Sequence, residues 1–209
     1  KWAVICEHII RHYTEGWANG FHWDMPYWEI WNEPDVQPLC WDGSTAEFCE
    51  LFCTAFAHLK ACFPHLKIGG PSMSSLHNRN GAWIRNFLAS LTEDGKRVPL
   101  DFFSWHAYMV EPEVIVTLEK YLRDRLDEAG YTETESILNE YNYVEGWTDL
   151  FISSIEAIIG MRGAAFTSAS MAVGQASTLD MLMYYDARPC AFCGMFDFYT
   201  YRPLKGYYP

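Results

Sequence analysis

The amino-acid sequence predicts an α/β fold in which parallel strands alternate with helices. Segments with helical periodicity alternate along the chain with short β-prone runs, and no linker or low-complexity stretch interrupts the 209 residues. The length fits a single domain, and a hydrophobic content of 50% supplies a sizeable core. An alternation of this kind favours parallel strands that are joined by right-handed helical crossovers.

Five short runs of apolar, β-branched and aromatic residues are predicted to be strands. Turn residues follow several of them, such as Pro34 after the first run and Gly70 after the second. The predicted strands are residues 27–32, 66–69, 102–106, 136–139 and 179–185.

The remaining segments have helical spacing. The clearest follows a capping box made by Ser44 and Glu47, after which apolar residues recur every three or four positions until Pro64 ends the pattern. Gly130 ends the predicted helix of residues 113–129. Gly160 and Gly163 weaken the join between the last two predicted helices. The predicted helices are residues 2–13, 45–63, 83–91, 113–129, 150–161 and 164–175.

Polar and aromatic side chains gather directly after the predicted strands. In a (β/α)8 TIM barrel these positions form the carboxyl-terminal mouth, where catalytic groups lie. A doubly wound open sheet is the alternative, but no Gly-rich phosphate loop follows the first strand. We therefore favour the barrel. The residues at the strand ends are Asn32, Glu33, Ser72, His106, Tyr108, Asn139, Glu140, Tyr185 and Asp186.

The charge balance argues against several partners. The chain has 15 Lys and Arg against 27 Asp and Glu, for a net charge of −12. Nucleic acids and anionic membrane surfaces both require a basic face, so we expect neither as a partner. The apolar stretches are shorter than the roughly 20 residues that a membrane span needs. Aromatic residues make up 17% of the chain, which suits a site that stacks on sugar rings.

Seven cysteines cannot all pair. Cys49 and Cys53 lie one helical turn apart, which favours buried thiols on a core-facing stripe. Cys190 and Cys193 form a CxxC motif, but neither a redox-fold context nor a second pair accompanies it, so we expect structural thiols rather than metal or redox chemistry. Unpaired cysteines and the lack of a visible export signal predict a cytoplasmic protein. The chain starts at Lys1 rather than Met, so we expect that its natural start lies upstream.

Two glutamates at predicted strand ends are each preceded by asparagine, as Asn32-Glu33 and Asn139-Glu140. Cleavage of a glycosidic bond requires a proton for the leaving oxygen and a second carboxylate for the anomeric carbon. Residues so distant in sequence meet only if their strands point at a common axis, as in a barrel. Glu29 lies on the same predicted strand as Glu33. We expect Glu29 to point into the barrel interior and to be structural.

The chain resembles glycoside hydrolase family 39, the β-xylosidase family of the barrel glycosidase clan, in the segments WEIWNEPD, KIGGPS, FFSWHAY and ILNEYNY. The resemblance extends from about Trp28 to Tyr208, and WNEP is its most specific part. In that family the glutamate after the fourth strand is the acid/base and matches Glu33, and the glutamate after the seventh is the nucleophile and matches Glu140. The resemblance implies retaining double displacement, with carboxyl groups about 5–5.5 Å apart.

Further residues are candidates for the sugar site. The resemblance implies that Asn32 donates to the sugar 2-hydroxyl. Tyr108 is placed to hold Glu140 by donating a hydrogen bond. His106 is a candidate ligand of a sugar hydroxyl, with a satisfied core histidine as the alternative. Candidate sugar platforms, with simple packing as the alternative, are Trp147, Tyr184 and Tyr185.

Five predicted strands are fewer than the eight of a complete barrel, which typically has about 250 residues. If the segment WNEP lies at the end of the fourth strand of a complete barrel, the chain holds only strands 4 to 8 of that barrel. Residues 1–209 are then the C-terminal portion of a glycoside hydrolase catalytic barrel. Because five parallel strands leave an open edge, we expect a further segment or chain to complete the barrel. The last strand ends in Tyr184-Tyr185-Asp186 where many clan members have Trp, so substrate preference is expected to differ.

These observations predict a retaining glycoside hydrolase that acts on β-xylosidic or related β-glycosidic bonds of a glycoside or oligosaccharide. The alternative is a non-catalytic carbohydrate-binding or assembly fragment of a barrel whose N-terminal half is missing. The two glutamates favour the enzyme, because a binding module has no use for the pair. No metal or cofactor is expected, since two carboxylates and water suffice.

Overall fold

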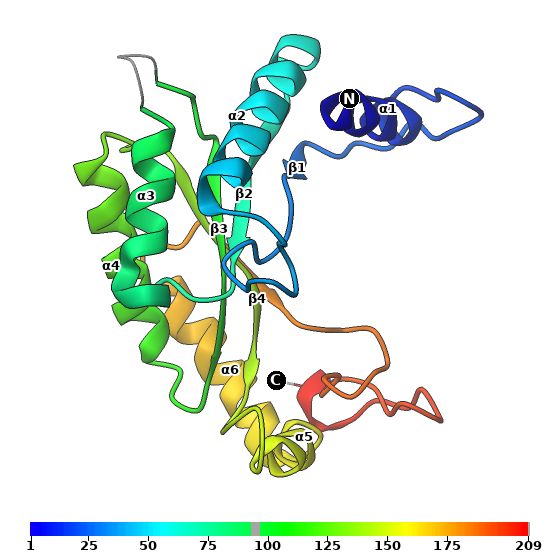
Figure 1. The fold of residues 1–209 in the computed structure, drawn as a ribbon. Helices are drawn as coiled ribbons and strands as arrows, with labels where there is room; N and C mark the ends of the chain where they lie inside the picture. Colours follow the sequence, from blue (N-terminus) through cyan, green and yellow to red (C-terminus); the bar gives the residue numbers. More distant parts are fainter. Residues whose placement is uncertain (93–96, 209) are drawn as a thin grey trace. The chain divides into compact units, whose positions relative to one another are not determined.

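The computed structural model describes residues 1–92 and 97–208, in which helices and strands alternate (Figure 1). The helices are α1 (Trp2–Thr14), α2 (Thr45–Cys62), α3 (Ala82–Ser90), α4 (Val114–Glu128), α5 (Phe151–Ile158) and α6 (Met161–Gln175), with short 3₁₀ turns η1 (Asn78–Gly81) and η3 (Lys205–Tyr207). The strands are β1 (Tyr27–Glu29), β2 (Lys67–Met73), β3 (Phe102–Met109), β4 (Glu135–Tyr143) and β5 (Met181–Tyr184).

The strands form one sheet in chain order, β1-β2-β3-β4-β5. β1 runs parallel to β2 with Tyr27 opposite Lys67, and β4 runs parallel to β5 with Ile137 opposite Met181. Parallel strands in sequence order, separated by helices, confirm the predicted α/β class of partial (β/α)8 type. None of the helices in the described residues is long and apolar enough to cross a membrane.

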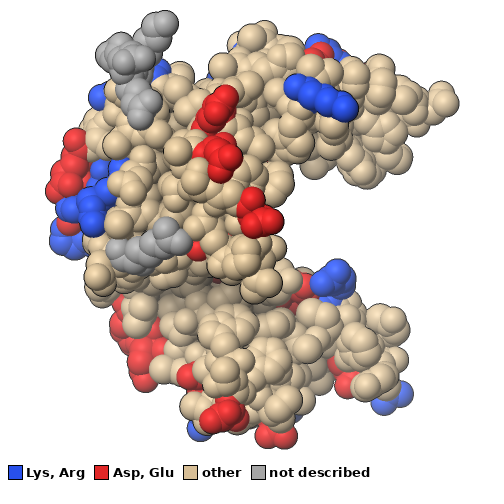
Figure 2. Space-filling model, viewed as in Figure 1, with Lys and Arg blue, Asp and Glu red and all other residues tan. Residues whose placement is uncertain are grey.

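The chain divides into two compact units, and the division falls within β3. Unit 1 comprises Lys1–Ser104 and Leu126–Glu135, and unit 2 comprises Trp105–Arg125 and Ser136–Pro209. On the face drawn in Figure 2, acidic and basic side chains lie scattered over a largely uncharged surface.

The core of unit 1 is built from aromatic side chains at helical spacing. Phe48 and Phe52 of α2 and Trp83 and Phe87 of α3 are fully buried. The ring centroids of Phe52 and Phe87 are 5.0 Å apart, and those of Phe48 and Trp83 are 5.7 Å apart. Edge-to-face and tilted pairs at these distances add to the free energy of apolar burial.

The capping box predicted for α2 is confirmed. Ser44 Oγ accepts a hydrogen bond from the Glu47 backbone N–H at 3.2 Å, and a Glu47 carboxylate oxygen accepts from the Ser44 N–H at 2.8 Å.

We expect Ser44→Ala to lower the free energy of unfolding by about 1 kcal/mol, because the Glu47 N–H loses its acceptor. The loss is measured by chemical denaturation. Thr54→Ala, at an exposed position within α2, is the matched control and should change stability by less than about 0.5 kcal/mol. Equal losses in the two variants would contradict a capping role.

In unit 2, a buried carboxylate joins α4 to β4 and to the turn before β5. Glu119 is 1% exposed and accepts hydrogen bonds from the hydroxyls of Ser136 and Thr178, the latter at 3.0 Å. Burial raises the pKa of Glu119, against the effect of these two hydrogen bonds. The two hydroxyls satisfy a carboxyl group that burial would otherwise penalise.

The helices agree with the predicted ranges to within about three residues, but the strands differ more. β2, β3 and β4 continue past their predicted ends at residues 69, 106 and 139. Gly70 reads as a strand terminator, yet its φ of +140° lets β2 bend and continue close to the backbone of the β1 segment. β1 is shorter than predicted because Trp31, with φ of +75°, leaves the extended conformation. Because β2, β3 and β4 are longer than predicted, Ser72, Tyr108 and Glu140 lie inside strands rather than after them.

Two smaller expectations need correction. Glu29 is exposed rather than buried, because β1 is the first strand of the sheet and pairs on one side with β2 alone. All seven cysteines lie in the described residues and none of them forms a disulfide; Cys49 is buried, but Cys53 is only half-buried. The stripe on α2 therefore buries one of these two thiols completely.

Candidate active site

In unit 1, Asn32 and Glu33 lie in a turn that follows β1. The Glu33 N–H donates to the carbonyl of Ser72 at 2.9 Å, and the Val36 N–H donates to the carbonyl of Glu33 at 3.0 Å. Trp31 and Glu33 have φ of +75° and +48°, in the left-handed region that side chains other than glycine rarely adopt. Such backbone costs on the order of 1–3 kcal/mol per residue and persists only where its surroundings impose it.

Asp35 fixes this turn from inside unit 1. Its carboxylate is buried and accepts hydrogen bonds from the Ser74 N–H at 2.9 Å, the Ser74 hydroxyl at 2.6 Å and Asn78 Nδ2 at 2.9 Å. Three donors offset the cost of burying the charge. Sequence reasoning missed this positioning role, although Asp35 is part of the WNEPD segment.

The side chains of Asn32 and Glu33 differ in their surroundings. Asn32 is exposed, and its Oδ1 accepts from the Ser72 hydroxyl at 3.2 Å, which orients its Nδ2 as a donor. Glu33 is half-buried, and the Cys40 thiol lies 3.9 Å from its Oε2. Burial, and then the Glu33 carboxylate, raise the pKa of Cys40. The neighbouring thiol therefore stays neutral and adds no negative charge beside the carboxyl group.

In unit 2, β3 and β4 bring Glu140, Tyr108 and His106 together. The Tyr108 hydroxyl donates a hydrogen bond to Glu140 Oε1, and His106 Nε2 lies 3.7 Å from Glu140 Oε2. His106 is 2% exposed, whereas the Glu140 side chain is 19% exposed. Tyr108 and His106 are two residues apart on β3, so alternation along the strand points both at the same carboxylate. Oε1 of Glu140 thus lies against Tyr108 and Oε2 against His106, and these two contacts fix the orientation of the carboxylate.

Aromatic rings gather around Tyr108, the residue that donates to this carboxylate. Trp147 is 59% exposed and meets the Tyr108 ring edge to face, with centroids 4.8 Å apart. Phe192 lies 5.8 Å from Tyr108, 6.1 Å from Trp147 and 5.9 Å from Tyr185. Burial, and then the Glu140 carboxylate, raise the pKa of Tyr185. An exposed flat ring beside an oriented carboxylate can stack on the apolar face of a sugar.

Tyr184, which is also a predicted sugar platform, has different contacts. Its hydroxyl accepts a hydrogen bond from the Gly194 N–H at 3.0 Å, and its ring packs edge to face on the buried Tyr141 with centroids 5.8 Å apart. Burial raises the pKa of Tyr184. The Tyr184 hydroxyl also donates to the carbonyl of Phe192 at 3.3 Å. These contacts are typical of a packing residue.

Sequence reasoning missed Asn142 and Phe192. Asn142 is 1% exposed, and its Nδ2 donates to the carbonyls of Tyr185 at 2.6 Å and Phe192 at 2.9 Å. One side chain of β4 therefore holds both segments that carry these rings. The position of Asn142 between two tyrosines, two residues after Glu140 in the segment ILNEYNY, is a signal for Asn142. Phe192 has no comparable signal, because it lies in the CxxC segment, where the two thiols are the only side chains that suggest chemistry.

Comparison with known proteins identifies related sequences. The sequence model of the family described as Glycosyl hydrolases family 39 matches residues 1–136. A beta-xylosidase of Geobacillus stearothermophilus is 30% identical over 126 residues, which is 59% of this chain and 23% of the relative. A beta-xylosidase of Caldicellulosiruptor saccharolyticus is 29% identical over 110 residues, or 52% of this chain and 20% of the relative. The chain thus spans about a fifth to a quarter of the length of these relatives.

Solved structures show the same fold. A glucosidase from Croceicoccus marinus has a TM-score of 0.75 at 30% identity, and the match covers 88% of this chain and 37% of the glucosidase. The GH39 enzyme from Xanthomonas axonopodis pv. citri has a TM-score of 0.68 at 17% identity, covering 98% of this chain and 42% of that enzyme. At that lower identity the likeness is one of fold alone.

Proposed function

Because this chain belongs to the glycosyl hydrolases family 39, we propose that it cleaves β-xylosidic or related β-glycosidic bonds with retention of configuration, with Glu33 as acid/base and Glu140 as nucleophile. The observation that carries the proposal is the environment of Glu140. Its carboxylate is oriented by the Tyr108 hydroxyl and adjoined by His106 beside a partly exposed aromatic cluster. A nucleophile needs a fixed orientation toward the anomeric carbon.

The proposed reaction has two steps. In the first, a Glu140 oxygen forms a bond to the anomeric carbon while the glycosidic bond breaks, and Glu33 gives its proton to the leaving oxygen. In the second, Glu33 takes a proton from water, the water oxygen attacks the anomeric carbon, and the bond to Glu140 breaks. Two inversions leave the released sugar with its original configuration.

The other candidates would bind the sugar. Asn32 is proposed to donate from Nδ2 to the 2-hydroxyl, and His106 to contact a hydroxyl beside Glu140. Trp147 and Tyr185 are proposed as stacking surfaces. Two relatives are named beta-xylosidase, which favours a xylose-type sugar, and the likeness to a glucosidase makes β-glucosides the next substrate to test.

We also propose that a further segment or chain completes the barrel. The described residues form a sheet of five strands, and the match of the chain covers 37% of the glucosidase structure. The alternative function is a non-catalytic fragment that holds sugar on the exposed Trp147 ring.

Assays separate these two functions. The 209-residue chain and a longer parent protein are incubated with aryl β-xyloside and aryl β-glucoside, and NMR records the anomer that is released first. We expect turnover by the longer protein, with the β-anomer formed first. An α-anomer formed first would overturn retention, and no turnover on a panel of aryl glycosides would overturn the enzymatic function.

Tyr108→Phe tests the orientation of the proposed nucleophile. A hydrogen bond to a charged group is worth about 1.5–3 kcal/mol, so kcat should fall roughly 10- to 100-fold, while KM changes little. Tyr199→Phe, at a residue that is 83% exposed, is the control and should leave kcat unchanged. A change in KM alone would place Tyr108 in substrate binding instead.

A further inference from the structure

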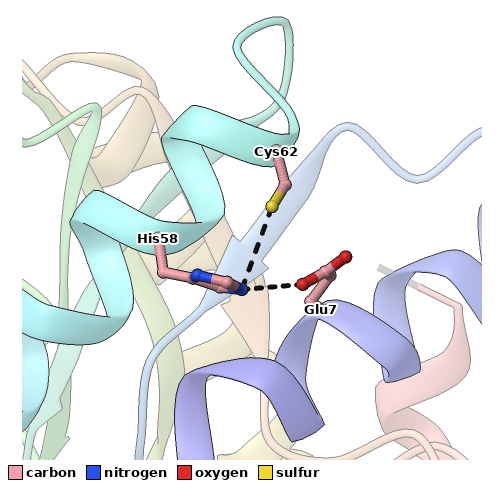
Figure 3. A group of neighbouring side chains, drawn as sticks. All are labelled: Glu7, His58 and Cys62. Atoms are coloured by element: carbon pink, nitrogen blue, oxygen red, sulfur yellow. Dashed lines mark hydrogen bonds and ion pairs between the residues drawn. The ribbon is translucent and has the colours of Figure 1, made fainter.

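Three side chains with metal-binding atoms converge where α1 packs on α2 within unit 1 (Figure 3). Glu7 comes from α1, and His58 and Cys62 come from α2. His58 Nε2 lies 2.7 Å from Glu7 Oε2 and 3.9 Å from Cys62 Sγ, and the three ligand atoms all lie within 4.8 Å of one another. All three residues are half-buried, so an ion has access from solvent.

We propose that Glu7, His58 and Cys62 bind one Zn²⁺ ion, with water as the fourth ligand. Zinc takes carboxylate, imidazole and thiolate ligands in a tetrahedron, at about 2.0–2.3 Å. This geometry separates the ligand atoms by about 3.3–3.6 Å. The observed separations of 2.7 and 3.9 Å fall on either side of that range. Small side-chain rotations would therefore be enough to admit the ion.

The backbone already holds the ligands in place. His58 and Cys62 are four residues apart on α2, so they lie on one face of the helix, one turn from each other. Figure 3 shows their side chains and that of Glu7 pointing toward one another from the two helices. The packing of α1 on α2 brings the third ligand to this face. A site that is formed before the metal arrives needs little ordering on binding.

The local charge also favours a divalent cation. Arg11 Nε donates to Glu7 Oε1 at 2.8 Å, which leaves Oε2 facing His58, and Arg11 Nη1 contacts Glu15 at 2.5 Å. The hydrogen bonds from Arg11 and then His58 lower the pKa of Glu7, so its carboxylate is ionised. With Cys62 as thiolate, the charges of Glu7, Glu15, Arg11 and Cys62 sum to about −2, which matches the ion. A ligating carboxylate that is itself hydrogen-bonded is the usual arrangement at metal sites.

Zinc must displace a proton from Cys62. Burial raises the pKa of the Cys62 thiol, followed by the effect of the Glu7 charge. The ion therefore competes with that proton. The alternative to a metal site is a hydrogen bond between Glu7 and His58 that joins the two helices without an ion.

Cobalt spectroscopy distinguishes these alternatives. Co²⁺ is added to the purified, reduced, metal-free protein, followed by Zn²⁺ as competitor. We expect one Co²⁺ per chain with a thiolate-to-cobalt charge-transfer band, and loss of that band when one equivalent of Zn²⁺ is added. The absence of a thiolate band, with no Zn²⁺ bound in a parallel calorimetric titration, would overturn the proposal.

Variants then assign the ligands. Cys62→Ser and His58→Gln should each weaken Zn²⁺ binding by at least about 10- to 100-fold. The matched controls Cys53→Ser, on the same helix, and His65→Gln, at an exposed position, should bind as the unchanged protein does. Binding retained in Cys62→Ser, or lost equally in the controls, would contradict the assignment.

A measurement on the unchanged protein does not depend on the folding of any variant. Bound Zn²⁺ should slow alkylation of Cys62 by iodoacetamide at least about tenfold, as measured by mass spectrometry of its peptide, because the coordinated thiolate is no longer available. The rate at Cys53 should not change. Equal alkylation of Cys62 with and without Zn²⁺ would also overturn the proposal.

Discussion

Glu140→Ala is expected to lower kcat/KM on an aryl β-xyloside by at least about 10⁴-fold, the order of loss seen when a hydrolase loses its nucleophile. Alanine leaves no atom that can bond to the anomeric carbon, and it leaves a space beside the Tyr108 hydroxyl. Azide should enter that space and restore part of the turnover. Because azide attacks once from the side of the missing carboxylate, the product should be the α-glycosyl azide.

The control for this experiment is Glu156→Ala, at an exposed glutamate of α5, which should retain full activity. Circular dichroism of both variants tests whether the fold is kept. A folded Glu140→Ala protein with activity within about tenfold of the unchanged protein would show that another group is the nucleophile. Formation of a β-glycosyl azide would show that Glu140 acts on the other side of the sugar.

Glu33→Gln should make the rate depend strongly on the leaving group. Glutamine cannot donate a proton as an acid does, and general acid catalysis contributes about 10²–10⁴-fold. We expect a loss of that size on an alkyl β-xyloside. The first step on a dinitrophenyl β-xyloside should change much less, because dinitrophenolate leaves without a proton.

Pre-steady-state kinetics with the two substrates measure this difference. The variant should show a burst of dinitrophenolate followed by slow turnover, because Glu33 is also needed to activate water in the second step. Glu50→Gln, at an exposed position on α2, is the control and should show neither effect. An equal loss on both substrates would contradict the role of Glu33 as acid.

The sequence predicted the helices well because their signals are local. The box formed by Ser44 and Glu47 starts α2 where expected, and the apolar spacing behind it gives the buried face that packs on α3. The two Asn-Glu pairs are likewise recognisable from the residues next to them in the sequence. They stand out because each lies at the end of a predicted strand, a relation that is visible without any tertiary contact, although Asn139 and Glu140 prove to lie within β4.

The features that were missed depend on contacts between distant residues. At Gly70, β2 runs so close to the carbonyl oxygen of Ile30 that a Cβ there would lie 2.9 Å from it, so the glycine serves this close approach rather than ending the strand. A rule based on Gly and Pro alone does not reveal that Ile30 lies there. Asn142 and Phe192 are 50 residues apart, and only the fold brings them together. The same holds for the proposed zinc ligands, because the spacing of His58 and Cys62 is visible in the sequence but Glu7 lies 51 residues before His58.

The most direct test of the proposed pair is the separation of its two carboxyl groups in a crystal structure of the longer protein with xylose bound. We predict that the carboxyl oxygens of Glu33 and Glu140 lie about 5–5.5 Å apart on either side of the anomeric carbon. A separation of about 6.5–9.5 Å would indicate an inverting enzyme. Carboxyl groups that point away from each other would contradict the proposed function.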